Sequence, residues 1–411
     1  MTIPVGLGFA ASSFTLAQLN VLSAAGVKFI RIDTGWDGIE TSLGVYNFTT
    51  LDTNVNNILT AGLQPLLILD YNSTLYAASK FTGITTAPNL AAWLNFVTAV
   101  VNRYKNHNVV YEVWNEPNSS SFWISANPNE YSALLIATSP VIKATDSTAS
   151  VIGPALSEIH LDYLETCFIA GILPYIDALS IHPYIRSGPE DATSGNYGNN
   201  YTAIRALLTR YGYPNMTLFS SEWGYSSLWN PGNAPHLGYQ TYPPVTEAVQ
   251  AQYFPRQYMI NQMNNVKGSV WFTNNDTGSL NITFEDDGFG TFRTDGTTTK
   301  PSYTAMINMA PVLGKNYLSN LASVSGEYMP VFLDPGAGLD CIAYRTTGAP
   351  HQTTIPLPAG YTPSVSSVSL TNTAKAISAP LTTSKTPPAA SINSLKVTIT
   401  GTPQYVSLNY A

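Results

Sequence analysis

The chain has 411 residues and a formal net charge of −7, and 44% of its residues are hydrophobic. Only 10% are charged, against roughly 25% in typical soluble domains. Without a basic patch to neutralise phosphates, nucleic-acid binding is excluded. No apolar run has the length of a membrane span, so we expect no membrane partner. The composition favours an extracellular protein, and secretion is therefore the expected localisation.

The cysteine and aromatic contents narrow the class further. Two cysteines, Cys167 and Cys341, are too few for a disulfide framework or a zinc cluster, and buried free thiols are favoured over a long-range bridge. The chain has 25 Tyr and 7 Trp. Aromatic faces with polar tips suit sugars, although a Tyr-rich core explains the same numbers.

Eight short apolar runs alternate with segments of helical periodicity up to about residue 313. The runs cover residues 5–10, 27–33, 65–71, 109–115, 150–155, 176–182, 216–222 and 268–273. Most are nearly continuous in apolar residues, as expected for strands of a parallel sheet that is buried on both faces. Eight strand-then-helix units predict an α/β fold, a (β/α)₈ TIM barrel over residues 1–313. A doubly wound sheet is disfavoured because no Gly-rich phosphate turn follows any strand.

Helix signals lie between these runs. Thr15 and Gln18 predict a capping box, and Asn127 with Pro128 predicts a capped first turn with Glu130 as a box partner. Further helices are expected near residues 51–62, 89–104, 159–170, 200–212, 245–264 and 300–313.

The pattern changes at about residue 314. Short alternating strands with Pro, Gly and Ser turns follow, almost without helix signals. This pattern predicts an antiparallel β-sandwich as an accessory domain over residues 314–411.

Two glutamates occupy the ends of the fourth and seventh predicted strands. Glu116 precedes Pro117, which cannot continue the strand, and Glu222 ends the run at 216–222. In a TIM barrel the chemistry lies at the C-terminal ends of the strands. Two carboxyl groups across one bond are the working parts of glycosidic hydrolysis, so this pair is the candidate catalytic site.

Other polar and aromatic residues at strand ends are candidates for binding the substrate. They are Arg31, Trp36, Asn115, His182, Tyr184 and Trp271. Arg31 is expected near Glu222, where it would keep that carboxylate charged, while Trp114 or Trp123 would keep Glu116 protonated. His182 and Trp271 also have structural readings as a core histidine and as barrel packing. Asp33 is read as structural, and Glu112 is left out of the chemistry.

Several passages together resemble a known enzyme family. "VWNEPN" followed about a hundred residues later by "FSSEWGYSS" resembles the clan A retaining glycoside hydrolases. "FIRIDTGWDGIETSLGVYNFTTLD", "LSIHPY" and "GTFRTDGTTTKPSYTAM" make the chain most similar to glycoside hydrolase family 39, with family 5 as the nearest rival. The passage "VWFTNNDTG" does not match the family pattern, which leaves the sugar preferences open.

The resemblance implies a role for each matching residue. Glu116 would be the acid/base and Glu222 the nucleophile, while Asn115 would hydrogen-bond the sugar 2-hydroxyl. Tyr184 would orient Glu222 with His182 nearby, and Trp271 would form a sugar platform. The resulting expectation is a retaining β-glycoside hydrolase that acts on an oligo- or polysaccharide with no metal and no organic cofactor. A non-catalytic carbohydrate-binding barrel and a transglycosylase with the same glutamates are the alternatives.

Overall fold

The computed structural model describes residues 3–227, 244–276 and 288–313, and most of the strands with parts of their connections between 315 and 410. The chain forms two compact units. The first comprises Met1–Ile185, Asp191–Trp223 and Asn265–Phe272, and the second comprises Arg186–Glu190, Gly224–Asn264 and Thr273–Ala411. The predicted boundary between residues 313 and 314 stays a prediction.

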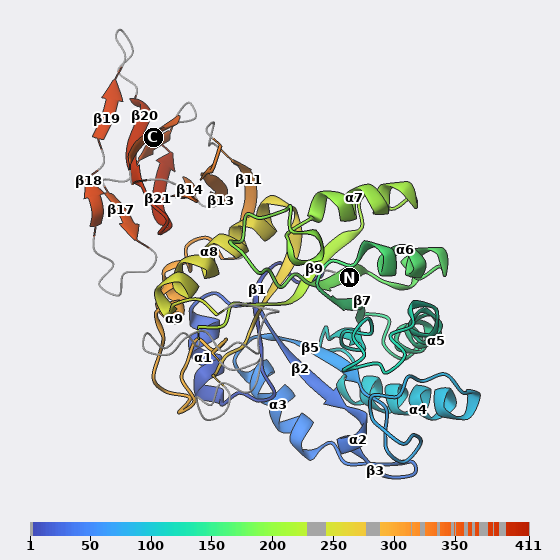
Figure 1. The fold of residues 1–411 in the computed structure, drawn as a ribbon. Coiled ribbons are helices and arrows are strands. Elements are labelled where there is room, and N and C mark those ends of the chain that lie inside the picture. Colours follow the sequence, from blue (N-terminus) through green and yellow to red (C-terminus); the bar gives the residue numbers. More distant parts are fainter. Residues whose placement is uncertain are drawn as a thin grey trace. The chain divides into compact units, whose positions relative to one another are not determined.

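A closed parallel barrel forms the first unit (Figure 1). Its strands follow the order β1-β2-β5-β6-β7-β8-β9-β10 around the ring. They are β1 (Gly6–Ala10), β2 (Phe29–Gly35), β5 (Gln64–Asp70), β6 (Val110–Val113), β7 (Ser150–Ser157), β8 (Ala178–His182), β9 (Thr217–Trp223) and β10 (Val266–Phe272). All eight predicted strands are confirmed. The prediction of a (β/α)₈ barrel is therefore confirmed.

At least one helix follows each barrel strand in the chain. The helices are α1 (Leu16–Ala24), α2 (Trp36–Ile39), α3 (Thr49–Thr60), α4 (Ala87–Tyr104), α5 (Pro128–Thr145), α6 (Leu161–Ile169), α7 (Tyr201–Arg210), α8 (Glu247–Met263) and α9 (Pro301–Asn308). Short elements complete this part: β3 (Glu40–Ser42), β4 (Val45–Tyr46), η1 (Leu173–Tyr175) and η2 (Gly195–Tyr197). None of the helices in the described residues combines the length and apolarity needed to cross a bilayer.

The caps are partly as predicted. Thr15 and Gln18 form the expected capping box at the start of α1. Asn127 caps α5 by accepting hydrogen bonds from the next turn. The box partner was wrong, because the Glu130 carboxylate accepts hydrogen bonds from Ser125 and Trp123 instead.

Two phenylalanines fill the barrel interior near the N-terminal ends of the strands, which we call the floor of the barrel. The rings of Phe29 and Phe219 lie 5.4 Å apart between their centroids, within a fully apolar core layer. Neighbouring strands carry glycine beside them: a Cβ at Gly8 would lie 2.3 Å from the Phe29 ring, and one at Gly268 would lie 2.0 Å from the Phe219 ring. The polar residues of the barrel therefore lie above a floor without charges.

Antiparallel strands follow residue 314 in the second unit. They are β11 (Asn316–Asn320), β12 (Glu327–Tyr328), β13 (Pro330–Asp334), β14 (Gly338–Arg345), β15 (His351–Pro356), β16 (Tyr361–Pro363), β17 (Ser366–Ser369), β18 (Ile377–Pro380), β19 (Thr382–Lys385), β20 (Ile392–Ile399) and β21 (Gln404–Tyr410). One sheet has the order β11-β13-β14-β21-β17-β18, and another has β15-β20-β19. The antiparallel pairing is as expected, while their assembly into a sandwich stays a prediction. Cys167 and Cys341 are both buried and form no disulfide bond with each other, as favoured.

Candidate active site

The two candidate glutamates meet at the C-terminal ends of the barrel strands. Glu222 lies in β9, and Glu116 lies three residues beyond the end of β6. A carboxylate oxygen of each and one ring nitrogen of His182 all lie within 4.8 Å of one another. Both glutamates are 9% exposed. The predicted convergence of the two carboxyl groups is therefore present.

The backbone turns sharply to bring Glu116 into this position. Strand β6 ends at Val113, earlier than predicted, because Trp114 and Glu116 adopt left-handed conformations with φ values of 68° and 46°. Such values are unusual for residues with side chains and cost of order 1–3 kcal/mol each. The Glu116 amide is held by the carbonyl of Ala155 at 3.0 Å. The rest of the barrel therefore holds this loop in a strained form.

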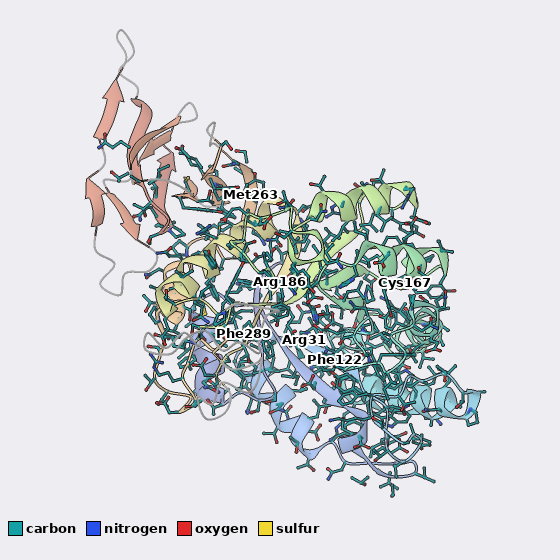
Figure 2. All side chains as sticks on the ribbon, viewed as in Figure 1. Arg31, Phe122, Cys167, Arg186, Met263 and Phe289 are labelled. Atoms are coloured by element: carbon teal, nitrogen blue, oxygen red, sulfur yellow. The ribbon has the colours of Figure 1, made fainter. Side chains whose placement is uncertain are left out.

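Arg31 connects the polar groups of the site (labelled in Figure 2). Its Nε donates to Glu112 Oε2 at 2.7 Å and its Nη1 donates to Glu222 Oε1 at 2.8 Å. Its Nη2 donates to Asn115 Oδ1 at 2.8 Å. The side chain is 3% exposed, and the adjacent carboxylates hold its pKa above the usual value despite burial. Arg31 is thus a permanent positive charge between two carboxylates.

Glu112 was left out of the chemistry in the sequence interpretation, but its carboxylate forms an ion pair with Arg31. It is fully buried, and it faces the barrel interior from β6. Burial raises the pKa of its carboxyl group, but the charge of Arg31 outweighs this effect and the pKa lies below its ordinary value. Alternation along β6 would have aimed Glu112 inward toward Arg31.

Glu222 is held by three side chains. Besides Arg31, the Tyr184 hydroxyl donates to Oε2 at 3.0 Å, and His182 Nδ1 lies 3.4 Å from the same oxygen. Burial is the largest influence and raises the pKa of Glu222, although Arg31 and Tyr184 act to lower it. Arg31 lies beside Glu222 as expected, and its charge favours the ionised carboxylate, but desolvation has the larger effect and the pKa therefore lies above its ordinary value. Tyr184 lies where the resemblance places it.

His182 contacts the glutamates rather than facing an open cavity. Its Nε2 lies 3.4 Å from Arg31 Nη2, a group that can only donate, so Nε2 is the accepting nitrogen. The proton therefore resides on Nδ1, which donates to Glu116 Oε1 at 2.8 Å. Burial lowers the pKa of His182 to about 4, so the ring is neutral at neutral pH. With no exposed surface, His182 does not fit the expected role of a sugar contact.

The two tryptophans predicted to bind sugar are both fully buried. Trp36 begins α2, where its ring packs on Tyr76 and Phe96, with centroids at 5.0 and 5.6 Å. Trp271 lies at the end of β10 with its ring edge-on to Trp223 at 4.9 Å. Neither ring offers an exposed face, so the predictions of a sugar contact for Trp36 and of a platform for Trp271 were wrong for this structure.

An aromatic wall that sequence reasoning missed borders the same opening. The Tyr71 ring stacks on Phe122 at 5.8 Å and meets Trp114 edge-on at 5.4 Å. Phe81 packs against Tyr71 at 5.1 Å. Tyr71 and Phe122 are only partly buried. Tyr71 directly follows β5, and that strand-end position was the available signal.

The set of Glu116, His182 and Glu222 resembles a metal-ligand group in its spacing. Two features oppose that use. The Nδ1 atom of His182 carries the proton that it donates to Glu116, and the guanidinium of Arg31 already neutralises Glu222. A neutral histidine between two carboxyl groups suits proton transfer better.

Comparison with known proteins shows the family of the chain. The model of the glycosyl hydrolases family 39 matches residues 19–352, and the chain belongs to that family. A β-xylosidase of Geobacillus stearothermophilus is 27% identical over 220 residues, which cover 46% of this chain and 43% of that protein. A β-xylosidase of Caldicellulosiruptor saccharolyticus is 26% identical over 153 residues, covering 34% of this chain and 31% of that one. The chain thus spans less than half the length of these curated relatives.

Solved structures share the fold at low identity. A family 39 glycoside hydrolase from Bacteroides cellulosilyticus WH2 superposes with a TM-score of 0.76 at 19% identity, covering 99% of this chain and 81% of that one. A monomeric β-xylosidase from Caulobacter crescentus CB15 gives a TM-score of 0.68 at 17% identity, with 99% and 96% coverage.

Proposed function

We propose that this protein is a retaining glycoside hydrolase that cleaves β-glycosidic bonds in an oligo- or polysaccharide. The observation that carries the proposal is the approach of one Glu116 oxygen and one Glu222 oxygen to within 4.8 Å. Retaining enzymes hold their carboxyl groups about 5–5.5 Å apart, whereas inverting enzymes leave roughly 6.5–9.5 Å for a water molecule. The short separation favours direct attack by one carboxylate.

Glu222 is the better nucleophile of the two. Arg31 and Tyr184 each donate a hydrogen bond to its carboxylate, which stabilises the ionised form. In the first step an oxygen of Glu222 bonds to the anomeric carbon, and the bond from that carbon to the leaving oxygen breaks. The product is a covalent glycosyl ester on Glu222.

Glu116 is then the acid and base. His182 donates to Oε1, so Oε1 accepts a hydrogen bond and Oε2 is the atom to carry the acidic proton. Glu116 gives this proton to the leaving oxygen in the first step. In the second step it takes a proton from water, whose oxygen attacks the anomeric carbon and displaces Glu222.

Asn115 and Arg31 prepare the sugar site. Because Asn115 Oδ1 accepts from Arg31, its amide nitrogen is left to donate. This orientation suits a hydrogen bond to the sugar 2-hydroxyl, a contact that strengthens in the transition state. These steps use the side chains of the site and one water molecule. The extracellular location inferred from composition is part of the same proposal.

The decisive experiment is hydrolysis of 4-nitrophenyl β-D-xylopyranoside, chosen because the curated relatives are named β-xylosidases. A panel of other 4-nitrophenyl β-glycosides and of polysaccharides would extend the test. Proton NMR should show the β-anomer as first product. Glu222→Ala should abolish turnover, and the partly exposed Glu165→Ala on α6 is a control that should leave turnover unchanged. An α-anomeric first product, or an active Glu222→Ala, would contradict the assignment.

The alternatives give different results in the same assays. A binding barrel would retain sugar affinity without turnover in the wild type. A transglycosylase would form longer products when acceptor sugars are added, with little free sugar released.

A further inference from the structure

Two aspartates near the candidate site have no role in the steps above. Asp33 follows Arg31 by two residues in β2, and Asp70 ends the adjacent strand β5. Side chains alternate along a strand, and Phe29 and Ile68 of these strands belong to the barrel core. Asp33 is four residues after Phe29 and Asp70 is two residues after Ile68, so each lies on the same face of its strand as the core residue. Both therefore face the barrel interior above the floor.

The two side chains differ in exposure. Asp70 is fully buried, and neither of its carboxyl oxygens forms a hydrogen bond. Asp33 is exposed, although Phe29 and Arg31 on the same face of β2 are at most 3% exposed. An inward-facing residue can be exposed only where the barrel opens to solvent. Asp33 therefore lines the mouth of the barrel.

The surroundings of Asp70 favour the neutral, protonated form of its carboxyl group. Burial, and next the negative charge of Asp33, raise the pKa of Asp70 well above its usual range. The protonated group has an O–H to donate, and Asp33 is within its reach. A buried polar group without a regular partner requires an explanation, and a role at a binding site is one such explanation.

Tyr71 connects the aspartates to the candidate catalytic pair. Burial first, and then the charges of Asp70, Asp33 and Glu116, raise the pKa of Tyr71. Tyr71 directly follows Asp70 in the chain, and its hydroxyl is within hydrogen-bond reach of Asn115, which precedes Glu116. Asp33 lies on the same face of β2 as Arg31, which bonds to Glu222 and Asn115, so Asp33 lines the mouth beside the candidate pair.

We propose that Asp33, positioned by Asp70, determines specificity by accepting hydrogen bonds from hydroxyl groups of a neutral sugar and by repelling anionic sugars. This inference rests on the proposed function and adds a substrate class to it. A carboxylate only accepts hydrogen bonds, and a charged acceptor binds a hydroxyl more strongly than a neutral one. The same charge opposes the carboxylate of a uronic acid.

The test compares 4-nitrophenyl β-D-xylopyranoside with 4-nitrophenyl β-D-glucuronide. Asp33→Asn should lower kcat/KM for the xyloside about 10- to 100-fold, mainly through a higher KM. The ratio of kcat/KM for the xyloside to kcat/KM for the glucuronide should therefore decrease. The exposed Asp162→Asn on α6 is the matched control and should leave both values unchanged. Equal losses on both substrates, or no loss on the xyloside, would overturn the role of Asp33.

Asp70 is a positioning residue in this proposal, so its variants separate charge from packing. Asp70→Asn keeps a neutral donor of the same shape and should retain KM near the wild-type value. Asp70→Ala should raise KM severalfold with a smaller effect on kcat. If the asparagine variant is as impaired as the alanine variant while both unfold at the wild-type temperature, Asp70 does not act by donating to Asp33.

A binding measurement distinguishes this inference from the proposed function. Xylobiose is titrated calorimetrically into Glu222→Ala and into Glu222→Ala with Asp33→Asn, so that the sugar is not hydrolysed during the measurement. Weaker binding to the double variant, by about tenfold or more, supports the inference even if the wild type hydrolyses no β-glycoside, which would sink only the proposed function. Equal affinities would reject the role of Asp33 whatever the turnover.

Discussion

Arg31 donates from Nη1 to Glu222 at 2.8 Å while its Nε donates to Glu112 at 2.7 Å, so two buried carboxylates share one guanidinium. Removing a partner from a buried charge costs about 3–5 kcal/mol, because the remaining charge stays desolvated. The same side chain therefore supports both the stability and the chemistry of the site.

Substitutions at Arg31 should separate these two contributions. Arg31→Met should lower the free energy of unfolding by about 3–5 kcal/mol, and Arg31→Met with Glu112→Gln should recover part of that loss without recovering turnover. Arg31→Lys keeps the charge but loses the planar set of N–H donors that binds three partners, so kcat should fall about 100-fold or more. Urea unfolding and initial rates measure both effects, with the exposed Arg210→Lys as control. Full activity in Arg31→Lys would contradict the need for three directed donors.

The acid limb of the rate profile should follow Glu222. Because its pKa is raised above 4.5, kcat/KM should fall as the pH drops, with a midpoint above that value. Tyr184→Phe removes a hydrogen bond that lowers this pKa. The midpoint should therefore move to higher pH in Tyr184→Phe. A midpoint that stays in place would show that another group controls the limb.

Burial of neutral His182 should make stability depend on pH. Its pKa is lowered from 6.5 to about 4, so below pH 6.5 the unfolded chain binds a proton that the folded chain does not. The free energy of unfolding should decrease as the pH falls from 6.5 toward 4, by up to about 3 kcal/mol from this group. His182→Asn should flatten that part of the curve, and the exposed His107→Asn should not. Parallel curves for the wild type and His182→Asn would refute the idea.

The left-handed backbone at Glu116 should be visible in stability. Its φ of 46° favours glycine, which lacks the Cβ that clashes there. Glu116→Gly should be more stable than Glu116→Ala by about 1 kcal/mol. At Glu165, inside α6, the order should reverse by about the same amount. Chemical denaturation of the four variants measures these differences. If the same residue, glycine or alanine, gives the more stable variant at both positions, the prediction is contradicted.

The glycines of the barrel floor should not tolerate a methyl group. In Gly268→Ala the Cβ would lie 2.0 Å from the Phe219 ring, so we expect a loss of about 1–3 kcal/mol or more. Adding Phe219→Leu should recover part of it. Gly38→Ala, where nothing lies within 4 Å of the added atom, is the control and should be neutral or stabilising. If Gly268→Ala unfolds like the wild type, the floor is less tightly packed than we describe.

Sequence reasoning could predict the barrel because its signals are local. Apolar runs and caps record the alternation of strand and helix directly, as the capping box at Thr15 shows. The convergence of Glu116 and Glu222 was also predictable, since the ends of parallel strands share one rim. The fold topology brings these two residues to the same rim of the barrel.

The failures have a different origin. Trp36 and Trp271 were assigned to the sugar because tryptophan at a strand end can face either a cavity or a neighbouring helix, and sequence does not separate the two. The roles of Glu112 and Asp70 were missed because a buried carboxyl group is explained only by its partner or by the lack of one. The backbone turn at Glu116 arises from tertiary contacts, which no local pattern records.

The apolar floor formed by Phe29 and Phe219 limits the path by which substrate and products could enter and leave the barrel. Among the described residues, the apolar layer that contains Phe29 and Phe219 fills the barrel beneath Arg31 and Glu112, and the candidate site lies at the C-terminal ends of the strands. In the proposed mechanism, the incoming glycoside, the departing aglycone, the attacking water and the released sugar would all pass through this end of the barrel. The released sugar would therefore compete with the next substrate molecule for the same path, and the turnover rate would depend on the rate of product release.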